Sequence, residues 1–135
     1  MDDVDWEPLR AAATAAMGRA YAPYSNFPVG AAALLDDGRI VSGCNIENAS
    51  LGVTLCAECT MVGALRMGGA GAPARIRAFY CVDGAGAVLM PCGRCRQLLY
   101  EFRAPGMVLM TGRGVRTMEQ VLPDAFGPED LGRHA

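Results

Sequence analysis

The sequence has little charge, and it lacks the runs of basic residues that nucleic-acid binding requires. Asp, Glu, Lys and Arg make up 19% of the 135 residues, below the roughly 25% of an average soluble domain, and the net charge is -2. Without a basic run, the chain does not supply the electrostatic attraction on which sequence-independent binding to nucleic acid depends. A small neutral partner is therefore predicted, and the shortage of charge indicates surface buried between subunits.

Long apolar runs and a basic leader are also missing. The apolar run at residues 29–35 is far shorter than the roughly 20 residues of a membrane span. The first residues are acidic where a secretory signal peptide would be basic. We therefore expect a cytoplasmic protein with no membrane association, in which the six cysteines stay reduced.

The chain is long enough for one hydrophobic core and shows no internal repeat, so a single domain is expected over residues 1–135. Helical spacing is predicted at 6–17, with Asp5 as N-cap, and at 56–67, 91–102 and 118–122, before an irregular tail. Extended segments are predicted at 29–35, 40–44, 76–82, 88–90 and 107–110, and Asp36-Asp37-Gly38-Arg39 is typical of a hairpin turn. This order predicts an α/β fold, a three-layer α/β/α sandwich with a mixed sheet of about five strands.

Four of the six cysteines form two C-x-x-C pairs, and both pairs fall at the start of a predicted helix. The pairs are Cys56-Ala57-Glu58-Cys59 and Cys92-Gly93-Arg94-Cys95. In a reducing compartment such pairs indicate metal binding, whereas Cys44 and Cys81, in predicted strands, are expected to be buried. One interpretation is a structural zinc site closed by all four thiolates, but a chain this apolar does not need a metal in place of a core.

A second interpretation is a catalytic site in which three thiolates bind the metal and a fourth position stays open for water. Cys92 and Cys95 are three residues apart, so they share one face of a helical turn and can bind one ion together with Cys56. Glu58 is then placed to move protons without coordinating the metal. Three thiolates leave Zn²⁺ with a net charge of about −1, which two helix N-termini and Arg94 would offset.

Further motifs surround the cysteine pairs, and their order is highly specific. They are Tyr24-Ser25-Asn26-Phe27-Pro28-Val29-Gly30-Ala31-Ala32, Gly43-Cys44-Asn45-Ile46-Glu47-Asn48-Ala49, Arg96-Gln97 and Leu122-Pro123-Asp124-Ala125-Phe126-Gly127-Pro128. With Cys56-Ala57-Glu58 and Pro91-Cys92-Gly93-Arg94-Cys95, nearly the whole chain resembles the small homotetrameric cytidine deaminases of the zinc deaminase superfamily.

This resemblance implies one Zn²⁺ per chain, bound by Cys56, Cys92 and Cys95, and a homotetramer with pockets shared between subunits. It also implies the reaction: hydrolytic deamination of cytidine and 2′-deoxycytidine to uridine and 2′-deoxyuridine with release of ammonia, as in pyrimidine salvage. Zinc-activated hydroxide would attack C4 of the base, and Glu58 would carry the protons.

The resemblance assigns the substrate contacts to residues outside the cysteine pairs. Asn45 and Glu47 would hydrogen-bond the ribose hydroxyls, for which an amide and a carboxylate are suitable partners. Phe27 would stack near the pyrimidine, Phe126 would close the pocket from a neighbouring subunit, and the backbone N–H of Ala57 would meet the base carbonyl. Without the resemblance, packing is the simpler interpretation for both phenylalanines, and a turn is the simpler one for the asparagine-rich segment.

Two positions depart from the commoner pattern of that family. Cys59 stands where an arginine usually hydrogen-bonds the zinc thiolates, and we expect Arg94 to take over this contact. Leu51 stands where an aromatic residue usually touches the adjacent subunit. Details of the subunit interface therefore do not transfer from the resemblance.

Three other functions compete with this prediction. A binding module with a four-thiolate zinc site would use all four paired cysteines, and a deaminase of a related aminopyrimidine nucleoside antibiotic would share the Pro-Cys-Gly-Arg-Cys-Arg-Gln motif. The Asn45-Ile46-Glu47-Asn48 segment favours cytidine over the antibiotic. A polynucleotide editor would need a basic groove, which this sequence does not supply. His134, the only histidine, lies in the tail and is expected to be solvated.

Overall fold

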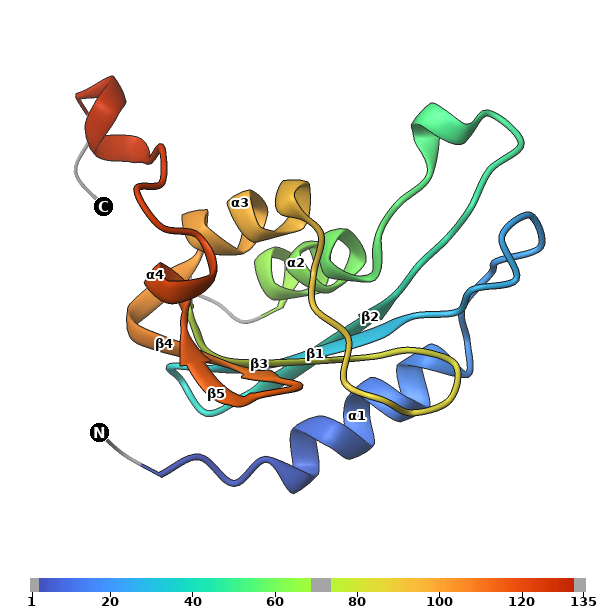
Figure 1. The fold of residues 1–135 in the computed structure, drawn as a ribbon, viewed down its shortest axis with the longest axis horizontal. Coiled ribbons are helices and arrows are strands. Elements are labelled where there is room, and N and C mark those ends of the chain that lie inside the picture. The colour runs from blue at the N-terminus through green and yellow to red at the C-terminus, as the bar shows by residue number, and fades with distance from the viewer. Residues whose placement is uncertain (1–2, 69–73, 133–135) are drawn as a thin grey trace.

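The computed structural model describes residues 3–68 and 74–132, which form one five-stranded sheet with helices on both faces (Figure 1). The strand order is β2-β1-β3-β4-β5. The strands are β1 (Gly30–Leu35), β2 (Ile40–Cys44), β3 (Ile76–Val82), β4 (Arg103–Thr111) and β5 (Gly114–Thr117). The helices are α1 (Glu7–Met17), α2 (Ala57–Met67), α3 (Gly93–Glu101) and α4 (Met118–Val121), with short 3-10 turns η1 (Leu51–Val53) and η2 (Pro128–Leu131).

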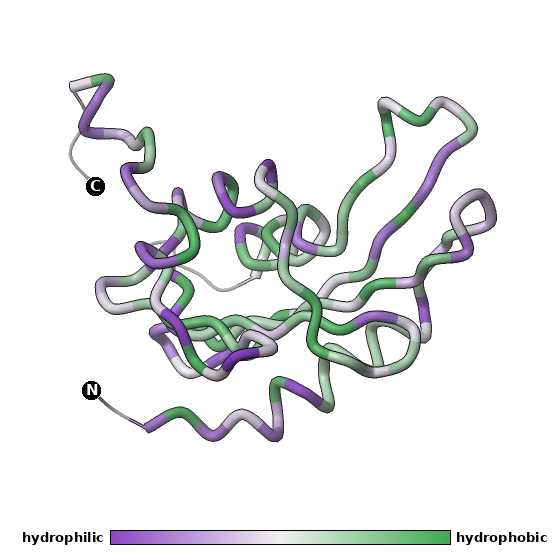
Figure 2. The backbone as a smooth tube through the Cα atoms, in the orientation of Figure 1, coloured by the Kyte–Doolittle hydropathy of each residue, from purple (hydrophilic) through white to green (hydrophobic). Residues whose placement is uncertain are grey.

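The central strands are buried on both faces because successive side chains point to opposite sides of the sheet. On β1, Ala31 belongs to the core that contains α2 and α3, whereas Ala32 belongs to the core that contains α1. On β3, Phe79 and Tyr80 divide in the same way. Figure 2 shows these strands as a largely hydrophobic layer between helices of mixed hydropathy. The predicted α/β/α sandwich is therefore confirmed.

The sheet is mixed because only one pair of neighbouring strands is parallel. β3 and β4 run parallel and are joined through α3, whereas β1 pairs antiparallel with both β2 and β3, and β4 pairs antiparallel with β5. The β1–β2 hairpin turns where the Asp-Gly signal predicts, and Gly38 has the positive φ of 91° that such a turn requires. No helix within the described residues is both long enough and apolar enough to cross a membrane.

The two helices that carry cysteine pairs begin one residue after a cysteine. Cys56 is the extended N-cap of α2, and Cys92 is the extended N-cap of α3, so Pro91 precedes the helix that it was expected to open. The predicted cap of α1 was wrong, since Trp6 takes the N-cap position without a side-chain cap bond. The Asp5 carboxylate still accepts a hydrogen bond from Glu7 N at 3.3 Å.

Some strand boundaries also differ from the prediction. Residues 88–90 are not a strand, and only Val88 forms an isolated bridge, to Val82. β4 begins at Arg103 instead of residue 107, β5 was not predicted, and the irregular tail contains η2. α2 ends at Met67, the predicted end of that helix, with Gly68 as its C-cap.

A close contact between α2 and β2 positions the start of α2. A Cβ atom on Gly43 would lie only 2.4 Å from Met61 N and 2.5 Å from Ala57 O, so the helix approaches as closely as it does only because this position is glycine. In this first turn of α2, Thr60 Oγ1 donates to Cys44 O at 2.8 Å and accepts from Cys44 N at 3.0 Å. These contacts hold the first turn of α2 over the end of β2.

Candidate metal and catalytic site

Three cysteine sulfurs gather where α2 and α3 begin. The Sγ atoms of Cys56, Cys92 and Cys95 all lie within 4.8 Å of one another, and Cys59 is not part of this group. Sulfurs that bind one zinc ion tetrahedrally at about 2.3 Å lie about 3.8 Å apart, and the grouping of these three Sγ atoms is compatible with that geometry. The three thiols therefore fit a zinc ion with one coordination position left over.

The surroundings of the sulfurs favour a cation with thiolate ligands. Both helices present their N-terminal ends to the cluster, where the helix dipole stabilises negative charge. Burial raises the pKa of the Cys56 and Cys95 thiols, whereas a hydrogen bond from the backbone N–H of Cys95 lowers the pKa of Cys92. A metal ion between the sulfurs would supply a positive charge that favours deprotonation of the partly buried Cys56 and the buried Cys95.

Glu58 is the carboxylate beside this cluster, in the first turn of α2. Only 4% of its surface is exposed, which is rare for a glutamate without a functional or ion-pair role. Burial raises the pKa of its carboxyl group above the usual range. A raised pKa suits a group that must first accept a proton and then return it near neutral pH.

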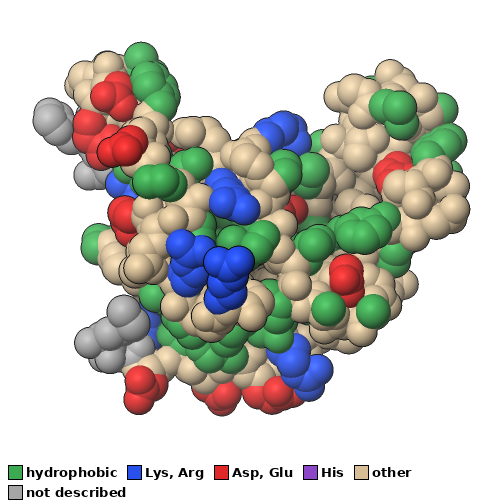
Figure 3. Space-filling model, in the orientation of Figure 1, with side chains coloured by type: hydrophobic (Ala, Val, Ile, Leu, Met, Phe, Trp, Pro, Cys, Tyr) green, Lys and Arg blue, Asp and Glu red, His purple; other side chains and the backbone are tan. Residues whose placement is uncertain are grey.

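Glu58 and the three cysteines line one cavity of about 210 Å³. The other lining residues are Val29, Asn45, Thr54, Leu55, Ala57, Leu89 and Met90. The backbone N–H of Ala57, at the first position of α2, has no acceptor within the helix and is available to a ligand. In Figure 3 the molecule is hollowed between two raised sides, with hydrophobic side chains on both of them. The cavity thus combines an apolar wall with a few polar groups, as small-molecule sites do.

Asn45 and Glu47 are only two residues apart in the sequence, but they line different hollows of the structure. Asn45 is 9% exposed and lines the cavity, where its side chain accepts from Val29 N at 2.9 Å and donates to Phe27 O at 2.9 Å. Glu47 lies in an adjoining hollow with Tyr24, Ser25, Leu51 and Thr54. Because Thr54 lines both spaces, the two hollows are neighbours.

The two phenylalanines are not core residues in this chain. Phe27 is 49% exposed and Phe126 is 57% exposed, and neither lines the cavity. Figure 1 shows the segment after α4 on one side of the molecule and the loop before β1 on the other. The two rings are therefore not packed in the core of the single chain, whereas packing between subunits, the other part of the simpler alternative, stays a prediction.

Arg94 reaches the sulfurs from α3. Its Nη1 donates to Cys56 Sγ at 3.7 Å and to Cys59 Sγ at 3.6 Å. Cys59 is partly buried. Of the two strand cysteines, Cys81 is buried as predicted, but Cys44 is only half-buried because it ends edge strand β2. His134 lies outside the described residues.

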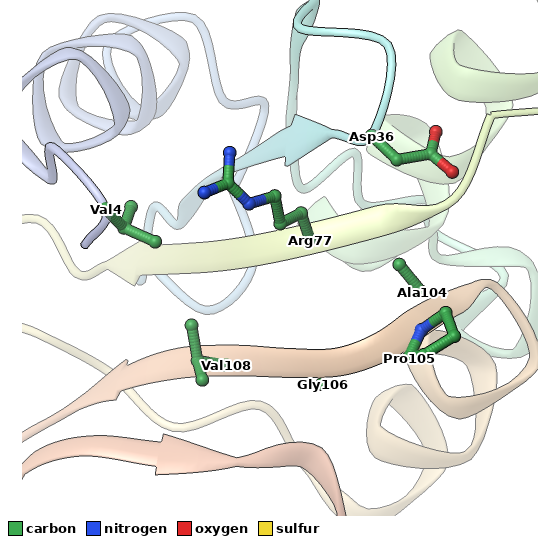
Figure 4. Close-up of a pocket in the computed structure, with 7 residues that line it drawn as sticks. All are labelled: Val4, Asp36, Arg77, Ala104, Pro105, Gly106 and Val108. Carbon is green, nitrogen blue, oxygen red and sulfur yellow. The ribbon is translucent and has the colours of Figure 1, made fainter. Parts of the chain in front are cut away.

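Four lining residues, Thr54, Leu55, Leu89 and Met90, were not predicted from the sequence. Each lies just ahead of a cysteine motif, and this proximity was the only available signal. A larger cavity of about 420 Å³ lies elsewhere, where Val4 approaches β3 and β4 (Figure 4). Among the described residues that line it, the ionisable ones are Asp36 and Arg77. The cysteine cluster and Glu58 line the smaller cavity instead.

A three-sulfur metal position beside a buried carboxylate, at two helix starts on one face of a mixed sheet, defines a metal-dependent hydrolytic enzyme. Comparison with known proteins specifies the class. Residues 5–111 match the family model for the cytidine and deoxycytidylate deaminase zinc-binding region. The chain belongs to this family of zinc-binding deaminases.

Relatives of known name agree with the family model. A cytidine deaminase of Mycobacterium tuberculosis is 56% identical over 133 residues, covering 98% of each chain. A cytidine deaminase of Sporosarcina psychrophila is 41% identical over 133 residues, covering 95% of this chain and 96% of that one. The crystal structure of cytidine deaminase from Mycobacterium leprae, 57% identical, superposes with a TM-score of 0.84 over 90% of this chain and 100% of that one.

Proposed function

We propose that this enzyme hydrolyses cytidine and 2′-deoxycytidine to uridine and 2′-deoxyuridine with release of ammonia, a step of pyrimidine salvage. The observation that carries the proposal is Glu58, a buried carboxylate that shares one small cavity with three clustered cysteine sulfurs. The identity to relatives that are named cytidine deaminases supports this substrate class.

Cys56, Cys92 and Cys95 would hold one Zn²⁺ per chain. The spacing of their sulfurs supports this assignment, as does the position of Cys59 outside the group. Zinc bound there acts as a Lewis acid that lowers the pKa of a water molecule for attack at C4 of the base. The two helix N-termini and the Arg94 guanidinium offset the negative charge of three thiolates.

Glu58 moves every proton in the proposed reaction. It accepts one proton from the attacking water and delivers it to N3 of the base, while the C4–oxygen bond forms. It then takes the remaining proton of the added hydroxyl and passes it to the amino group at C4. The C4–nitrogen bond breaks, ammonia leaves, and the carboxylate is regenerated, so water and cytidine are converted to uridine and ammonia.

The remaining substrate contacts follow from the walls of the cavity. The Ala57 N–H would donate to the base carbonyl, and Asn45 and Glu47 would bind the ribose hydroxyls. Phe27 would stack near the pyrimidine. Phe126 is proposed to serve the pocket of a neighbouring subunit in a homotetramer, a role that its exposure supports.

We also propose that residues 1–135 are one cytoplasmic domain that acts on free nucleosides, without nucleic-acid or membrane partners. The shared five-stranded sheet supports a single domain, because elements from both halves of the chain pack on it. Six unpaired cysteines support a reducing compartment. The absence of a basic run in the sequence argues against a polynucleotide substrate.

Loss of ultraviolet absorbance tests the proposed function directly. The purified protein should convert cytidine and 2′-deoxycytidine, with one zinc per chain by elemental analysis. Cytosine and cytidine monophosphate, assayed beside them, should be turned over far more slowly. Cytosine lacks the ribose, and cytidine monophosphate carries a phosphate on it. Turnover of an aminopyrimidine nucleoside antibiotic in place of cytidine would contradict the proposal.

The charge on Arg94 should also affect turnover. Replacing Arg94 with alanine removes the guanidinium from two sulfurs, so kcat should fall by about tenfold or more, as outer-shell changes at metal sites commonly cause. Zinc affinity, measured by competition with a chelator, should fall with it. Arg66→Ala is the matched control, since it removes the same charge from the exposed last turn of α2. Unchanged kcat and zinc affinity in Arg94→Ala would remove this role.

A further inference from the structure

The loop before β1 contains a turn beside the proposed pocket. Asn26 has a φ of 55°, in the left-handed region that asparagine adopts more readily than most residues with a side chain. Two backbone hydrogen bonds first join this loop to the segment after β2, from Tyr21 N to Asn45 O at 3.0 Å and from Glu47 N to Tyr21 O at 2.8 Å.

The Glu47 carboxylate then holds the loop with both of its oxygens. Oε1 accepts from Tyr24 N at 2.9 Å and from Ser25 N at 3.1 Å, and Oε2 accepts from the Ser25 hydroxyl. A carboxylate has about four acceptor positions, so roughly one remains, on Oε2. The Ser25 hydroxyl is also the main reason that the pKa of Glu47 lies below its usual range, which keeps this acceptor ionised.

Ser25 connects this carboxylate to the aromatic residue of the loop. Its hydroxyl has one hydrogen to donate, which goes to Glu47, and its oxygen accepts from Phe27 N at 3.0 Å. The bond from Phe27 N spans Asn26, whose φ is positive. The Asn45 amide fixes the next part of the loop through Phe27 O. One hydroxyl group thus links the orientation of Glu47 to the backbone that carries Phe27.

We infer that Ser25 is a positioning residue for nucleoside binding: it aims the remaining acceptor of Glu47 at the sugar and fixes the loop that presents Phe27 to the base. The inference rests on the proposed function, because it assumes that the sugar reaches Glu47. Ser25 touches neither zinc nor the reacting atoms in this account. Its loss should therefore weaken binding and leave the chemical step nearly intact.

Kinetics of Ser25→Ala test this role. We expect KM for cytidine to rise about tenfold, since a hydrogen bond to a charged group is lost, with kcat changed by less than about twofold. Ser25→Thr keeps the hydroxyl and should recover most of the loss. Ser42→Ala, an exposed serine on β2, is the matched control and should behave as the wild type does. A fall in kcat with unchanged KM, or equal losses in the alanine and threonine variants, would overturn the inference.

A double-mutant cycle separates positioning from a general weakening of the loop. If Ser25 acts through Glu47, then Ser25→Ala should change KM by less than about threefold in a Glu47→Ala background, where both acceptor oxygens are gone, so the two effects are not additive. Additive losses would show that Ser25 acts independently of Glu47 and would refute the inference.

Hydrogen exchange at the Phe27 amide distinguishes failure of this inference from failure of the proposed function. The exchange rate, followed by NMR without substrate, should rise about tenfold in Ser25→Ala, because the acceptor of that N–H is removed. If the wild type does not deaminate cytidine but this exchange still accelerates, the proposed function fails and the contact between Ser25 and the loop stands. Unchanged exchange would overturn the inference whatever the activity.

Discussion

Replacing Glu58 with glutamine is expected to lower kcat by about 10³-fold or more while the protein keeps its fold and its zinc. Glutamine has nearly the same shape, but its amide cannot accept a proton from water or return one to the base. General acid–base catalysis contributes about 10²–10⁴-fold to rates, and one carboxylate carries all of it here. The measurement is kcat with cytidine, with zinc content and melting temperature determined on the same preparation.

Glu101→Gln is the control for this variant, because it makes the same chemical change at the exposed end of α3. It should leave kcat within about twofold of the wild type. Retained activity in Glu58→Gln would refute the role of Glu58 as the proton carrier. Loss of zinc in that variant would show instead that the carboxylate supports the metal site.

Replacing a cysteine of the cluster and replacing Cys59 should have opposite effects on zinc content. Cys92→Ser removes a sulfur from the three-membered cluster, so the purified protein should contain little zinc and have no measurable turnover. Cys59→Ser changes a sulfur that contacts Arg94 but lies outside the cluster. This variant should keep one zinc per chain and retain most of its activity.

Elemental analysis of the two variants, with circular dichroism to verify folding, makes the comparison. Loss of zinc from Cys59→Ser would indicate a fourth thiolate and leave no open position for water. Full zinc occupancy in Cys92→Ser would show that a different set of ligands binds the ion. Either result would contradict the assignment of Cys56, Cys92 and Cys95.

Local sequence patterns were enough to predict most of the fold. The Asp-Gly turn sets the β1–β2 hairpin, and the helical spacing ahead of residue 17 sets α1 even though its cap was misplaced. β1 and β3 are buried on both faces, so their sequences are nearly continuous apolar runs, from which both strands were predicted.

The elements that were missed depend on tertiary pairing. β5 has only four residues, and two of them are exposed, so it shows no apolar alternation and is stabilised by its register with β4. β4 extends back through Pro105 and Gly106, residues that usually end a strand. In contrast, Leu89 and Met90 are apolar because they wall the cavity, and Val88 packs against the core that contains α1.

Some parts of the candidate site were also predictable from local patterns. The two C-x-x-C motifs and Glu58, inside the first of them, are such patterns, and the structure brings Cys56, Glu58, Cys92 and Cys95 into one cavity. The hydrogen bond from Ser25 to Glu47 could not be predicted, because 22 positions separate the two residues and the contact depends on how two loops pack together. The proposed role of Phe126 depends on contacts with a neighbouring subunit, which the sequence of one chain does not specify.

The three clustered sulfurs come from two helix starts, at positions 56, 92 and 95, with all of β3 between them. An ion bound to all three ties these starts together, and the chain between them becomes a ring. Closing such a ring removes many extended conformations from the unfolded chain, as a disulfide of similar span does. The concentration of free metal would therefore affect the stability of the fold as well as the activity. Removing the ion would open the ring and lower that stability.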